Sequence, residues 1–157
     1  APELHRADPV ERPMRTLLAS ATAAALAAIL AVPAAASSPY ADHPLVGTWR
    51  FDVPNTGCAE IYRFRTDGTS IVTSGQEIAE TEFEVSPKPT SKGFYVWTDT
   101  IVKDNGKQDC SGQITDIGRK TTNYIRFDRA GQAFVVCRGE SLDACFGPLR
   151  RIGGNVI

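Results

Sequence analysis

The chain has 157 residues, a length typical of one domain, and its hydrophobic fraction of 42% is enough for a core. Its formal net charge is −1 at pH 7, and no long block of one sign occurs. This balance argues against nucleic acid as a partner, because phosphate binding needs a basic face. It argues equally against membrane attachment through a polybasic segment.

The N-terminal part has the pattern of a secretory signal peptide. Arg15 follows Met14 as a short positive region, residues 17–32 are apolar and uncharged, and residues 34–36 are small alanines that suit a signal peptidase. The run is short and rich in alanine, which favours cleavage over a membrane span.

Three expectations about location follow from this leader. Residues 1–13 are expected to be an upstream remnant, and residues 14–36 a signal peptide that is cleaved after Ala36. The short alanine-rich apolar region and the Ala34-Ala35-Ala36 exit are typical of a Gram-negative bacterium. The rest is then periplasmic or secreted, without a membrane anchor.

All four cysteines, Cys58, Cys110, Cys137 and Cys145, follow the leader. An even number in an exported chain predicts disulfides, and three pairings are open. We favour Cys137–Cys145, which closes the short loop "CRGESLDAC", together with Cys58–Cys110. No Cys-x-x-Cys spacing occurs, so we do not expect a zinc site.

After Leu45 the sequence predicts an all-β domain, because short runs rich in Val, Ile, Thr, Tyr and Phe alternate with turn signals. Asp67-Gly68 and Asn105-Gly106 are typical of tight hairpins. Two prolines in residues 86–93 indicate a longer loop. The candidate strands are residues 47–53, 59–66, 69–74, 77–86, 93–104, 112–118, 122–128, 132–138 and 145–152.

These strands predict a single antiparallel up-and-down meander over residues 45–153, preceded by a flexible lead-in at 37–44. A meander of about eight strands must close or stack to remove its edges. Strict alternation predicts that Trp49 and Phe51 share one face. It also predicts that Ala79, Thr81, Phe83 and Val85 oppose Ile78, Glu80, Glu82 and Glu84. The facing of residues 93–104 stays open, because both faces of that strand carry aromatic residues.

The sequence offers little for catalysis. The one histidine after the leader, His43, lies in the lead-in, where we expect it to be exposed and not held for acid–base work. Glu80, Glu82 and Glu84 form a row on one strand face, which is typical of a wet surface. The aspartates around "DNGKQDC" lack the calcium-loop pattern. We therefore expect no catalytic residue, no metal and no cofactor.

The lumen of the barrel is the remaining candidate site. A small closed barrel either fills its lumen with side chains or leaves room for one small ligand. Close packing is the ordinary role of most of its aromatic residues, but some are expected to line a pocket, with Tyr62 or an inward arginine as the polar contact. The expected ligand-binding residues are Phe51, Tyr62, Phe64, Phe83, Trp97 and Tyr124.

The stretch "VGTWRF" carries a family resemblance. Gly47 and Trp49 match the Gly-x-Trp at the start of the first strand of lipocalins, and Arg150 or Arg151 matches their late arginine, which packs across the tryptophan ring. The chain thus resembles a lipocalin-like, calycin-type barrel. The resemblance implies that these residues close one end of the barrel, that the other end binds a small apolar molecule, and that no cofactor is needed.

Two functions from different classes are therefore expected. The first is an exported barrel that binds or carries a small hydrophobic ligand in its lumen. The alternative is a periplasmic or secreted protein-binding module, such as a protease or lysozyme inhibitor, that acts through its loops and especially the loop between Cys137 and Cys145. An enzyme that works at the barrel mouth with Asp, Glu or Tyr side chains is a third.

Overall fold

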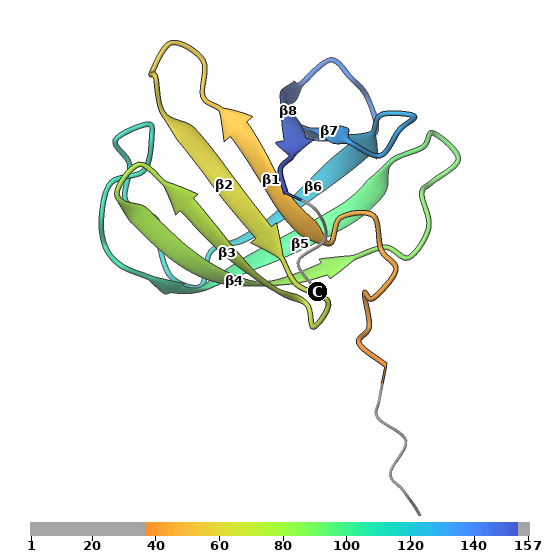
Figure 1. Ribbon diagram of the computed structural model, residues 1–157, viewed down its shortest axis with the longest axis horizontal. Helices are drawn as coiled ribbons and strands as arrows, with labels where there is room; N and C mark the ends of the chain where they lie inside the picture. The colour runs from red at the N-terminus through yellow and green to blue at the C-terminus, as the bar shows by residue number, and fades with distance from the viewer. Residues whose placement is uncertain (1–36, 154–157) are drawn as a thin grey trace, which may run out of the picture. The chain divides into compact units, whose positions relative to one another are not determined.

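The computed structural model describes residues 37–153, so the expected leader lies outside the described residues. In this range eight antiparallel strands close into a barrel in sequence order (Figure 1). They are β1 (Gly47–Asp52), β2 (Ala59–Phe64), β3 (Thr69–Ser74), β4 (Glu77–Val85), β5 (Tyr95–Asp104), β6 (Lys120–Phe127), β7 (Ala133–Cys137) and β8 (Cys145–Arg151). The predicted all-β, up-and-down closed barrel is confirmed. No helix in the described range is long and apolar enough to cross a membrane.

Both favoured disulfides are confirmed. Cys58–Cys110 joins the β1–β2 loop to the long loop between β5 and β6, residues 105–119, across a sequence separation of 52. Cys137–Cys145 joins the facing ends of β7 and β8. All four cysteines thus staple loops at the same end of the barrel, which we call the mouth.

The strand expected at residues 112–118 is wrong, since this segment belongs to the 105–119 loop. The Asp109 carboxylate accepts hydrogen bonds from the backbone N–H groups of Ser111 and Gln113 and curls the chain. Ile114 and Ile117 stay 59% and 64% exposed. The alternation in "GQITDIG" therefore buries neither isoleucine, and local turn chemistry decides the conformation.

The facing of β5 follows from its pairing with β6. Trp97 lies opposite Asn123, and Tyr95 lies opposite Ile125, which is fully buried. Because Trp97 is also buried, Tyr95, Trp97, Asp99 and Ile101 form the inward face.

The end of the barrel opposite the mouth is closed around Trp49, which is 0% exposed. The Arg151 guanidinium lies 4.1 Å from the centre of the Trp49 ring, and Trp49 Nε1 donates to the Leu45 carbonyl at 2.8 Å. Gly47 has a φ of +132°, and a Cβ there would overlap the Arg151 guanidinium. This contact explains why glycine stands two residues before the tryptophan; Arg150 is exposed and takes no part in it.

The lead-in, residues 37–44, packs against this closed end. Tyr40 stacks on Phe83 with ring centres 5.1 Å apart, and His43 Nε2 lies 3.2 Å from the Ser86 carbonyl oxygen. Burial lowers the pKa of His43, with the hydrogen bond to Ser86 opposing it. His43 is thus half-buried and structural, not exposed.

The half of the lumen nearer the closed end is filled by aromatic side chains. Phe64 makes edge-on contacts with Phe83 and Trp97, both with ring centres 5.3 Å apart. Phe134 contacts Trp49 in the same way at 4.7 Å. A ligand inside this barrel must therefore occupy the half nearer the mouth.

Candidate ligand-binding cavity

A cavity of about 260 Å³ occupies the mouth half of the lumen, between the inward faces of β2 to β6 and the 105–119 loop. Its border includes exposed side chains such as Arg119 and Phe146, so solvent reaches it. The lining residues are Glu60, Tyr62, Val72, Ser74, Glu77, Ala79, Trp97, Asp99, Ile101, Asp109, Thr115, Arg119, Thr121, Asn123 and Phe146.

The 105–119 loop is fixed over the rim by backbone contacts as well as by its disulfide. The Gln76 N–H donates to the Gln108 carbonyl at 3.1 Å, and the Cys110 N–H donates to Ser74 Oγ at 3.0 Å. Gly75 has a φ of +60°, and a Cβ there would come within 3.1 Å of the Asp109 backbone. These contacts hold the cavity in shape without a ligand.

Both carboxylate oxygens of Glu60 accept a hydrogen bond on one wall. Tyr62 Oη donates to Glu60 Oε2 at 2.5 Å, and Ser74 Oγ donates to Glu60 Oε1 at 2.8 Å. Burial raises the pKa of Tyr62 well above its usual value, and the charges of Glu60, Asp99 and Glu77 raise it further. Three carboxylates from three strands therefore act on one phenol oxygen, which makes this part of the cavity electronegative.

Asp99 lies on the inward face of β5, two residues from Trp97. Its Oδ1 accepts a hydrogen bond from Thr81 Oγ1 at 2.7 Å, and Thr81 in turn lies 2.6 Å from Ser70 Oγ. Burial raises the pKa of Asp99 to about 6, against the opposing effects of the Thr81 hydrogen bond and the Arg119 charge. Asp99 is thus charged at neutral pH but destabilised by its surroundings.

Two nearly buried cavity residues have polar atoms without a hydrogen-bond partner among residues 37–153. Glu77 and Trp97 are each 5% exposed, and the atoms are Glu77 Oε1 and Trp97 Nε1. Asp104 Oδ2, beside Glu77, also has no hydrogen-bond partner among these residues. Burial raises the pKa of Glu77, and the Thr115 hydroxyl opposes the rise. The charge of Asp104, a side-chain hydrogen bond with Asp104 and the charge of Asp109 add to it. Buried polar groups are normally satisfied, so these exceptions point to a missing partner.

The lining carries four carboxylates and one basic group, Arg119. In the part of the chain that the structure describes, no three His, Cys, Asp or Glu side chains converge as metal ligands. The cavity therefore offers a ligand mainly hydrogen-bond acceptors, together with the indole N–H donor of Trp97.

The residues expected to bind a ligand divide into three groups. Tyr62 and Trp97 line the cavity. Phe51, Phe64 and Phe83 belong to the packed core cluster and do not line it. Tyr124 pairs with Val96 on the outer face of the sheet, opposite the face of Asn123 and Trp97.

Sequence reasoning missed Glu60, Glu77 and Asp99. The signal that could have found Asp99 is its place in strict alternation with Trp97, which puts both on one face. Glu77 shares its face with Ala79 and Thr81, so the same alternation places it inward.

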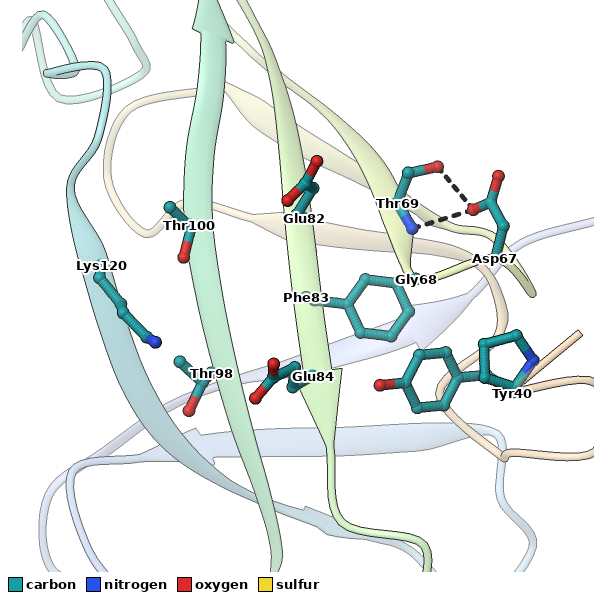
Figure 2. Close-up of a pocket in the computed structure, with 11 residues that line it drawn as sticks. Tyr40, Asp67, Gly68, Thr69, Glu82, Phe83, Glu84, Thr98, Thr100 and Lys120 are labelled. Carbon is teal, nitrogen blue, oxygen red and sulfur yellow. Dashed lines mark hydrogen bonds between the residues drawn. The ribbon is translucent and has the colours of Figure 1, made fainter.

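A second hollow of about 460 Å³ lies outside the barrel (Figure 2). Tyr40 and Phe83 lie at one side, near the Asp67–Thr69 hydrogen bonds, while Glu82 and Glu84 project from β4 beside threonines of β5. Both glutamates are exposed, and none of the unpartnered buried atoms named above lies in this outer groove. The mouth cavity is therefore the better candidate site.

Comparison with known proteins gives no relative from which a role could be transferred: no protein-family model, no curated protein and no solved structure matches this chain.

Proposed function

We propose that this protein binds a small molecule in the mouth cavity. The observation that carries the proposal is a cavity held in shape by its loop and lined by unpartnered, nearly buried polar atoms of Glu77 and Trp97. Concave sites with a few convergent polar groups and perturbed pKa values are the usual form of small-molecule sites.

The cavity limits the size and chemistry of the ligand. Its volume of about 260 Å³ accommodates roughly nine non-hydrogen atoms, at the ~30 Å³ that a water molecule occupies in the liquid. Val72, Ala79 and Ile101 supply apolar wall, and the carboxylates supply acceptors. The ligand we propose is thus smaller and more polar than the hydrophobic molecule that the resemblance implies.

We also propose that the barrel is of the lipocalin-like, calycin type and works outside the cytoplasm. The stacking of Arg151 on Trp49 and the need for glycine at Gly47 support the first point. The two disulfides are compatible with an extracellular or periplasmic location, since such bonds persist in oxidising compartments.

Filling the cavity tests the proposal. Ala79 is buried, lines the cavity and lies opposite Val72, so Ala79→Phe projects a ring into the ligand space. We expect fragments that bind the wild type in ligand-observed NMR to lose binding to this variant. Thr100→Phe, which alters the outer groove instead, is the matched control and should keep the same binders. Absence of binders, or equal binding to all three proteins, would contradict the proposal.

Exposed apolar residues at the mouth favour protein binding as a second candidate function. Leu142, in the loop between Cys137 and Cys145, is 57% exposed, and Ile114, Ile117 and Phe146 are also exposed on mouth-end segments. Exposed apolar side chains grouped on one part of a protein often mark protein–protein contacts. A module that acts through these loops does not need the cavity, so Ala79→Phe would leave its partner binding intact.

A further inference from the structure

We infer that the ligand of the mouth cavity is a small amine, bound as an ammonium ion beside Asp99. This inference rests on the proposed function and adds the chemical class of the ligand. It follows from which hydrogen-bonding groups of the cavity are already occupied, and from the charges that line it.

Two of the four lining carboxylates already accept two or more hydrogen bonds each. Both oxygens of Glu60 accept hydroxyl hydrogen bonds, from Tyr62 and from Ser74. Asp109 Oδ1 accepts three hydrogen bonds from Ser111 and Gln113 in its own loop. Asp99 and Glu77 therefore remain as acceptors for a ligand.

Those two carboxylates have acceptor capacity to spare. Within the described range Asp99 accepts one side-chain hydrogen bond, from Thr81, and Glu77 Oε1 accepts none. An ionised carboxylate offers about four lone-pair sites and no donor. A ligand group with several N–H donors and a positive charge fits this demand best.

The aromatic side chains around Asp99 favour a cation as well. Tyr62 and Trp97 line the same cavity, and aromatic faces attract ammonium groups electrostatically, more strongly when water is excluded. Val72, Ala79 and Ile101 then cover the hydrocarbon part of the ligand. An anionic ligand would instead face Glu60, Glu77 and Asp99, with Arg119 alone to attract it.

Proton binding competes with the amine at Asp99, because protonation removes the charge. The groups that act on or pair with Asp99 are Tyr62 from β2, Thr81 from β4, Arg119 from the 105–119 loop, and its β6 partner Thr121. Glu60 and Glu77 line the same cavity and act on Tyr62. Since the pKa of Asp99 is raised to about 6, amine affinity should fall as the pH is lowered through this value. The affinity for an uncharged analogue should not fall as the pH is lowered through this value.

Calorimetry with three similar probes tests the inference. Phenethylamine, 2-phenylethanol and phenylacetate each have about the nine to ten non-hydrogen atoms that the cavity admits. At about pH 7.5 we expect the amine to bind about tenfold or more tightly than the alcohol, a difference of ~1.4 kcal/mol, with phenylacetate weakest.

Charge variants sharpen the test. Asp99→Asn keeps an oxygen for the Thr81 hydrogen bond and should lose about tenfold in amine affinity, while alcohol binding changes little. Arg119→Gln removes a like charge at the border of the cavity and should strengthen amine binding severalfold. Arg138→Gln, an exposed arginine that does not line the cavity, is the matched control and should change nothing.

The outcomes separate this inference from the proposed function. If the alcohol or the acid binds as tightly as the amine and Ala79→Phe abolishes binding, the amine inference fails while the cavity function stands. Unchanged amine affinity in Asp99→Asn also overturns the inference. If none of the probes binds, the inference fails; if the fragment screen is empty too, the proposed function fails with it.

Discussion

Replacement of Trp49 by alanine is expected to lower the free energy of unfolding by about 3–5 kcal/mol, the usual cost of truncating a buried aromatic side chain. Trp49 is completely buried, packs on Phe134 and carries the Arg151 guanidinium on its ring. Its indole N–H is bonded to the Leu45 carbonyl, so the variant also removes this hydrogen bond at the closed end.

Urea denaturation measures this loss directly. Leu142→Ala is a suitable control, because Leu142 is mostly exposed and its truncation should change the free energy of unfolding by less than about 0.5 kcal/mol. A Trp49→Ala variant as stable as the wild type would mean that the closed end does not hold the barrel together.

Asp99→Asn is expected to have the opposite effect and to stabilise the folded protein above about pH 7. The folded-state pKa of Asp99 is about 6 against a usual value of 3.8, and each unit is worth ~1.4 kcal/mol, so burial of the charge costs roughly 3 kcal/mol. The amide carries no charge and avoids this cost. It also retains an acceptor oxygen for Thr81.

The sign of the pH dependence follows from the same shift. Between about pH 4 and pH 6 the folded protein binds more protons at Asp99 than the unfolded chain, so the stability from this group falls as the pH rises. Comparison of urea curves for the wild type and Asp99→Asn over this window should show the decline in the wild type alone. The exposed Asp116→Asn variant should keep the wild-type decline. Parallel curves for the wild type and Asp99→Asn would contradict burial of this carboxylate.

These two effects describe opposite ends of one barrel. The closed end contributes stability through aromatic packing, whereas the mouth keeps a buried charge that lowers stability. A costly group of this kind is typical of a binding site, because the ligand supplies the interaction that folding alone does not.

The fold could be predicted from the sequence because its determinants are local. Alternation defines the inward faces, Gly-containing turns separate the strands, and the order Gly47, Trp49 and a late arginine marks the closed end. The prediction failed at residues 112–118, where alternating isoleucines look like a strand and Asp109 instead folds a loop.

The site was harder to predict because its determinants are not local. The cavity lies where the aromatic packing near the closed end stops. There the Cys58–Cys110 disulfide holds the 105–119 loop over the rim. Alternation could have placed Asp99 inward beside Trp97. The expectation of an apolar lumen instead predicted aromatic ligand-binding residues such as Phe51 and Phe64, which are core residues. Which carboxylate oxygens lack a donor depends on contacts between strands that no short motif encodes.

The indole N–H signals of the two tryptophans offer the most direct test of the account. Trp97 Nε1 belongs to a residue of the mouth cavity and has no partner among residues 37–153, whereas Trp49 Nε1 is bonded to Leu45 at the closed end. In a ¹⁵N–¹H NMR titration with phenethylamine we expect the Trp97 signal to shift with saturation and the Trp49 signal to stay in place. A Trp97 signal that does not move, or equal shifts of both signals, would contradict a ligand site in the mouth of this barrel.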